Sequence, residues 1–117
     1  MTRGRLSRAA EFDAVAQLGR SIGGRYLTLR YRRRDPDEIA FIGPRVGFAV
    51  PRRVGGAVDR NSIKRRLKAA VDHHEQLLLD GADYVVIARA GLASAADAQD
   101  FEWLCGQVEE LLKAVDS

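Results

Sequence analysis

The hydrophobic pattern of the chain changes period at Pro51, and this change constrains the fold more than any other feature. Large apolar residues alternate with small ones over 46–50, which is the period-two pattern of a β-strand. Apolar residues then recur at helical spacing over 58–79. A second apolar run, at 84–88, lies between glycines and has the length of a buried, central strand. The sequence therefore predicts a strand–helix–strand unit.

The flanking segments complete a mixed fold. Residues 10–18 show helical spacing, with Ser7 as the expected cap and Gly19 after the end. Alternation from Tyr26 onward predicts a strand, and a short strand around Ile22 is possible. Residues 97–115 predict a C-terminal helix. Helix, two or three strands, helix, strand, helix is the order expected of a two-layer α/β (α+β) sandwich, and residues 1–117 form a single domain.

The charges are unevenly distributed along the chain. Residues 1–68 hold 17 Lys and Arg against 6 Asp and Glu, a net charge of +11, whereas residues 69–117 hold 2 against 10, a net charge of −8. Such asymmetry indicates a polyanion-binding face, and the planar guanidinium of the abundant arginines suits phosphate. A soluble protein with segregated charge and no nucleic-acid partner is the alternative.

Part of the positive charge lies on one side of the 58–79 helix. Arg60, Lys64 and Lys68 are spaced one turn apart, and Asn61 and Arg65 form a parallel row. Like charges at this spacing cost helix stability, and a phosphate backbone laid across them would relieve the repulsion. A merely solvated basic face is the alternative reading. Two further arginines precede the helix, at positions 52 and 53.

No catalytic or metal-binding constellation is visible in the sequence. His73 and His74 are adjacent, so on a helix they cannot share a face, and Cys105 falls on an apolar stripe. We therefore expect no catalytic residue, no metal site, no protein-bound cofactor and no small-molecule substrate. A single cysteine, no apolar run of membrane-spanning length and no signal peptide lead us to expect a cytoplasmic protein without a membrane partner.

The stretch "RVGFAVPRRVGGAVDRNSIKRRLK" at 45–68 resembles the signature of the bacterial ribonuclease P protein component family. The "RN..KR" spacing in this strand-then-helix setting carries the resemblance, which extends over nearly the whole chain. In that family a large RNA, acting with Mg²⁺, cleaves the 5′ leader from precursor tRNA, and the protein binds both RNAs. The resemblance also implies a left-handed βαβ crossover, against the usual rule.

The resemblance implies two sets of site residues. Contacts to the catalytic RNA are expected at Arg52, Arg53, Arg60, Asn61, Lys64, Arg65 and Lys68. A leader cleft between the first helix and the sheet is expected at Phe12, Thr28, Arg30, Gly47 and Ala49. The small residues of the strand at 46–50 could equally serve close helix packing.

The chain departs from the family pattern at two cleft positions. Ala16 stands where a second aromatic is usual, and Arg30 replaces an aromatic on the strand face. Phe12 and Arg30 would then carry most of the stacking. A stand-alone RNA-binding or ribosome-associated module remains the second hypothesis, and a metal-dependent protein nuclease the third.

Overall fold

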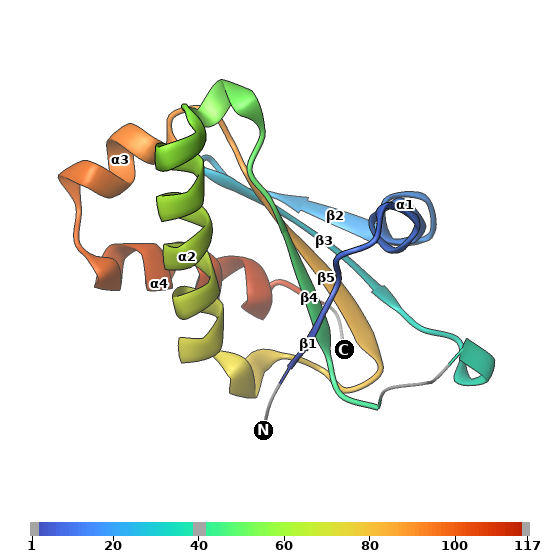
Figure 1. Ribbon diagram of the computed structural model, residues 1–117. Helices are drawn as coiled ribbons and strands as arrows, with labels where there is room; N and C mark the ends of the chain where they lie inside the picture. Colours follow the sequence, from blue (N-terminus) through green and yellow to red (C-terminus); the bar gives the residue numbers. More distant parts are fainter. Residues whose placement is uncertain (1–2, 39–41, 116–117) are drawn as a thin grey trace.

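The structure is a computed structural model that describes residues 3–38 and 42–115. Its strands are β1 (Gly4–Arg5), β2 (Arg20–Gly23), β3 (Leu27–Arg33), β4 (Arg45–Ala49) and β5 (Ala82–Ala88). Its α-helices are α1 (Ala9–Leu18), α2 (Ala57–His73), α3 (Leu92–Ala98) and α4 (Phe101–Lys113). Figure 1 shows α2, α3 and α4 on one side of the sheet and α1 on the other. The α/β sandwich is confirmed, with α1 partly covering the second face.

The five strands lie in the order β1-β4-β5-β3-β2. β5 is parallel to β4 and antiparallel to β3, so the apolar run at 84–88 occupies the centre of the sheet as its composition predicts. The chain leaves β4, passes through α2 and returns in β5 immediately beside β4. In Figure 1 the side of the sheet covered by α2 and α4 is on the left, and β4 lies in front of β5. For a viewer on that side, with both strands pointing up, β5 is to the left of β4. The crossover is therefore left-handed.

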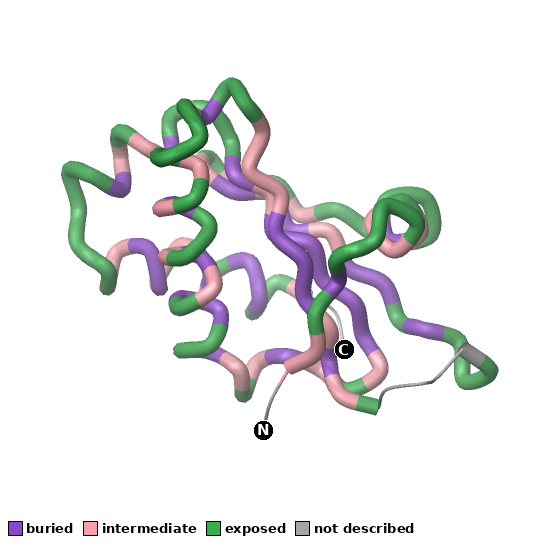
Figure 2. Tube along the Cα trace, in the orientation of Figure 1, coloured by how far each residue is buried: buried purple, intermediate pink, exposed green. Residues whose placement is uncertain are grey.

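The main core lies between the sheet and α2 and α4. Figure 2 shows the central strands buried and the outer side of α2 exposed. The apolar stripe of α2 is fully enclosed at Ile63, Leu67, Ala70 and Val71. Tyr84 of β5 is also buried, and its hydroxyl accepts the backbone N–H of Leu79 at 2.9 Å.

Several element boundaries differ from the sequence prediction. α2 ends at His73 instead of reaching residue 79, and a 3-10 turn, Glu75–Leu77, follows it. Ser7 does not cap α1, because the N-cap position falls at Arg8; the Glu11 carboxylate accepts the backbone N–H groups of both Ser7 and Arg8. β1 and α3 were not expected from the sequence, and the strand near Ile22 is present as β2.

Candidate nucleic-acid interface

The basic residues of α2 divide into three directions around the helix. Arg60, Lys64 and Lys68 flank the exposed edge of β4, where they line surface pockets. Arg65 points away from the core and is exposed. Arg66 points the other way, donating to Asp97 of α3 at 3.4 Å. The sequence prediction of one continuous basic flank is therefore confirmed for the first three residues.

A pocket of about 330 Å³ opens at the edge of β4, where β1 ends. Its lining combines cations with apolar side chains from β1, α1, β4 and α2: Arg3, Arg5, Leu6, Ser7, Phe12, Val46, Phe48, Lys64 and Lys68. Arg3 is fixed there, because its Nε donates to Asp72 at 2.7 Å and its guanidinium lies 5.4 Å from the ring centroid of Phe48. We call this hollow the basic pocket.

The basic pocket concentrates positive charge. Burial, together with the charges of Lys64, Arg5 and Arg3, lowers the pKa of Lys68 below its ordinary value. Among the described residues, no carboxylate lies within ion-pair distance of Lys64 or Lys68. An anion in the basic pocket would relieve this repulsion, so the electrostatics favour a phosphate ligand.

A smaller hollow of about 170 Å³ continues the surface toward the start of α2. It is lined by Val50, Ala57, Arg60, Asn61 and Lys64, so Lys64 borders both hollows. The Nε atom of Arg60 is buried and has no hydrogen-bond partner among the described residues.

The turn before α2 adds two cations to this end of the surface. Arg52 and Arg53 are exposed in the 3-10 turn Arg52–Val54. The glycines that follow do not use the left-handed backbone conformation, because Gly55 has φ 163° and Gly56 has φ −70°. Gly55 instead accommodates Asp59, whose Cβ would lie 3.0 Å from a Cβ added at Gly55.

The other face of the sheet presents its residues in three rows across β4, β5 and β3. Strand register places Arg45, Asp83 and Arg32 in the first row, Gly47, Val85 and Arg30 in the second, and Ala49, Ile87 and Thr28 in the third. α1 covers the middle row with Val15, which is fully buried and packs with Val85. The third row is half-buried, so it forms a partly open strip beside α1.

The five expected leader-contacting residues all lie on or against this face. Phe12 is half-buried, and its ring lies so close to Gly47 that a Cβ there would come within 2.6 Å of the Phe12 Cζ. The Phe12 ring therefore packs directly on Gly47. This contact favours close packing of α1 as the reason for a small residue at position 47. Because Phe12 also lines the basic pocket, it borders both faces of the candidate interface.

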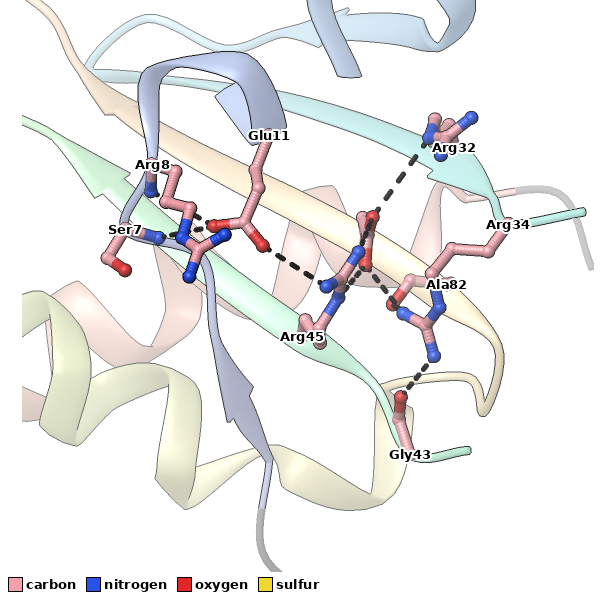
Figure 3. Close-up of polar contacts among 9 residues, drawn as sticks. Ser7, Arg8, Glu11, Arg32, Arg34, Gly43, Arg45 and Ala82 are labelled. Atoms are coloured by element: carbon pink, nitrogen blue, oxygen red, sulfur yellow. Dashed lines mark hydrogen bonds and ion pairs between the residues drawn. The ribbon is translucent and has the colours of Figure 1, made fainter. Parts of the chain in front are cut away.

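The first row is locked by ion pairs (Figure 3). Arg34 donates to Asp83 at 2.5 Å and to the carbonyl of Gly43 at 2.6 Å, and the Nε of Arg32 lies 4.0 Å from the Asp83 carboxylate. Arg32 and Arg34 are buried. Their charges are used in ion pairs within the fold. The net charge of +11 over residues 1–68 is therefore larger than the charge that a ligand could contact.

Glu11 links the ion-pair row to the start of α1. The backbone N–H groups of Arg8 and then Ser7 hold the pKa of its carboxyl below the ordinary value, and Arg45 adds to this effect, while partial burial opposes it. The carboxylate accepts a bond from Arg45 Nη1 at 3.2 Å. Glu11 therefore anchors the first turn of the helix that carries Phe12.

The two histidines do not behave as sequence reasoning predicted. His73 is the last residue of α2, but His74 leaves the helix with φ −118° and ψ 30°. The two side chains therefore approach each other and Cys105 of α4, with all three ligand atoms within 4.8 Å of one another. Cys105 is buried, as its apolar stripe predicts, and burial raises the pKa of its thiol, with Glu102 and Glu109 adding to the shift.

The left-handed α/β sandwich and the basic pocket together define an RNA-binding protein. The particular family follows from comparison with known proteins, since the family model for Ribonuclease P matches residues 1–116. The chain belongs to the ribonuclease P protein component family. The stand-alone module that the sequence left open is not supported.

Relatives and a solved structure are similar over nearly the full length. The ribonuclease P protein component of Acidothermus cellulolyticus is 39% identical over 111 residues, covering 95% of this chain and 87% of that protein. The one from Carboxydothermus hydrogenoformans is 30% identical, covering 96% and 94%. The structure of the RNase P protein from Thermotoga maritima is 26% identical, covers 98% of this chain and 100% of that one, and has a TM-score of 0.84.

Sequence reasoning missed the contribution of the N-terminal segment to the interface. Arg3 and Arg5 join the basic pocket only because β1 pairs in parallel with β4, some 40 residues further along the chain. A two-residue strand carries no periodic signal that could reveal this pairing.

No helix in the described part of the chain is long and apolar enough to span a membrane.

Proposed function

We propose that the chain acts in ribonuclease P by binding the catalytic RNA through α2 and the basic pocket, and by binding the 5′ leader of precursor tRNA along the open strip beside α1. The catalytic RNA supplies the bond cleavage together with Mg²⁺. The protein contributes no catalytic residue and holds no cofactor of its own in this proposal.

The observation that carries the proposal is the clustering of cations around Lys64. Arg3, Arg5 and Lys68 come from two distant parts of the chain to one pocket with aromatic walls. Phosphates would pair with these cations, while an unstacked base has the half-buried ring of Phe12 within reach of the same hollow. The exposed Arg52, Arg53 and Arg65 extend the positive field along the RNA backbone.

The test is cleavage of precursor tRNA by a ribonuclease P catalytic RNA at low Mg²⁺, with and without this protein. We expect the protein to stimulate cleavage and to show no cleavage alone. The double variant Lys64→Ala/Lys68→Ala should stimulate far less, whereas Lys113→Ala on the far helix α4 should match the wild type. Cleavage by the protein alone, or the absence of stimulation, would overturn the proposal.

A further inference from the structure

Three potential metal ligands meet where the end of α2 packs against α4. The nitrogens of His73 and His74 and the sulfur of Cys105 lie within 4.8 Å of one another. The two imidazole rings are nearly perpendicular, with centroids 5.0 Å apart. Tetrahedral zinc with its usual bond lengths separates nitrogen and sulfur donors by about 3.4–3.7 Å, so small side-chain rotations would bring this triad into range.

His74 gives an independent sign of a missing ligand. The residue is buried, with 8% of its surface exposed, and its Nε2 atom has no hydrogen-bond partner. Buried polar atoms are nearly always paired, so this nitrogen calls for an explanation. The His74 backbone is held on both sides, since its N–H donates to Val71 and its carbonyl accepts from Leu77, both at 2.9 Å. These bonds fix the backbone from which the imidazole projects.

We propose that His73, His74 and Cys105 form a binding site for Zn²⁺ that ties the end of α2 to α4. A thiolate with two imidazoles is a donor set that favours zinc over magnesium, which prefers oxygen ligands. Three protein ligands leave the fourth position to water, with entry from the side of the exposed His73. Zn²⁺ binding would release the thiol proton of Cys105 to solvent. The attraction between Zn²⁺ and the thiolate would outweigh the burial that disfavours the thiolate form.

The site is separate from the RNA surface described above. The basic pocket uses Lys64 and Lys68 from the middle of α2, on the flank near β4, whereas the triad uses the C-terminal end of α2 and α4. Zinc would therefore stiffen the α2–α4 layer behind the RNA-binding flank without contacting RNA. It is also distinct from the Mg²⁺ that accompanies the catalytic RNA.

The test is titration of the reduced, untagged full-length protein with Co²⁺ as a spectroscopic probe. The chain has two histidines and one cysteine, so a thiolate-to-cobalt charge-transfer band reports Cys105 unambiguously. We expect this band to appear, to be abolished by equimolar Zn²⁺, and to persist in excess Mg²⁺. Zn²⁺ should also raise the melting temperature.

Matched variants separate ligation from folding. His73→Gln changes an exposed side chain and should weaken Co²⁺ binding by more than about 100-fold, since even outer-shell changes cost 10–100-fold. Gln76→Ala, an exposed neighbour, should bind as the wild type does. Cys105→Ala should remove the band. Absence of the band in the wild type, unchanged affinity in His73→Gln, or an equal loss in Gln76→Ala would overturn the proposal.

Discussion

Arg45 of β4 holds the buried carboxylate of Asp83 of β5 through two parallel N–H···O bonds, one from Nε and one from Nη2, each 2.9 Å long. The two residues are direct partners in the strand register, so the ion pair lies across the β4–β5 seam. The remaining nitrogen of Arg45 reaches Glu11 of α1. One arginine thus joins the sheet to the helix that carries Phe12.

Removing the Asp83 carboxylate should destabilise the fold strongly. Asp83→Ala leaves Arg34 and Arg45 without their shared anion, and loss of one partner of a buried ion pair typically costs about 3–5 kcal/mol. Chemical denaturation measures the change. Asp97→Ala is the matched control, because Asp97 is exposed and its bond to Arg66 contributes at most about 1 kcal/mol. Equal losses in the two variants would contradict the structural role of the ion-pair row.

The contribution of Glu11 should depend on pH in the acid range. The pKa of its carboxyl is lowered from 4.5, so its stabilising effect is complete above that value and is lost as the pH falls through the lower, folded-state pKa. The stability difference between wild type and Glu11→Gln should be constant near neutral pH and shrink below pH 4.5. Thermal melts between neutral and acidic pH measure it. A difference that grows on acidification would contradict the assigned interactions.

Binding of the catalytic RNA should depend on salt through Lys64. Each phosphate contact contributes roughly 0.7–0.9 to the slope of log affinity against log salt. Lys64→Ala should lower that slope by about one contact's share, and Lys113→Ala on α4 should leave it unchanged. Filter-binding or fluorescence titrations over a range of salt concentrations give the slopes. An unaltered slope and affinity in Lys64→Ala would remove this residue from the interface.

Two neighbouring residues of α2 should separate binding from folding. Arg65→Ala should weaken RNA binding and leave the melting temperature equal or slightly higher, because it relieves like-charge repulsion. Leu67→Ala should cost about 2–5 kcal/mol, because Leu67 is fully buried. Stability and RNA affinity are measured on both variants. Unfolding of Arg65→Ala would show that this side chain is structural.

Phe12 should affect precursor and mature tRNA differently. Phe12→Leu keeps an apolar side chain over Gly47 but removes the aromatic face, and a stacked base is worth roughly 1–3 kcal/mol. The reconstituted particle should bind precursor tRNA about one to two orders of magnitude more weakly, with mature tRNA unaffected. The variant's melting temperature is the control for packing. Equal losses for both tRNAs would place the leader elsewhere.

Regular periodicity made most of the fold predictable. The alternation in β3 and β4 and the stripe of Ile63 and Leu67 in α2 report burial directly, and the structure bears them out. The C-terminal end of α2 and the capping residue of α1 were mistaken, because each depends on a single residue that a periodic pattern does not encode. His74 departs from helical geometry immediately after His73, and the N-cap of α1 is Arg8 instead of Ser7.

The site was only partly predictable for a similar reason. The α2 flank follows from helical spacing, so Lys64 and Lys68 could be placed on one side from sequence. The basic pocket also needs Arg3 and Arg5, whose position depends on long-range strand pairing. The burial of Arg32 and Arg34 depends on Asp83, about 50 residues away, and no local pattern marks them as unavailable to RNA.

The strand order also sets the sequence of events when the chain is synthesised. β1 with β4 and β2 with β3 form two separate pairs, and only β5 joins them. Until residue 88 has left the ribosome, the sheet is two unconnected halves, and α2 has no complete surface to pack on. Closing such non-local pairings is slow. α2 therefore acquires its final position only after β5, which ends at Ala88, has been made and is free to pair.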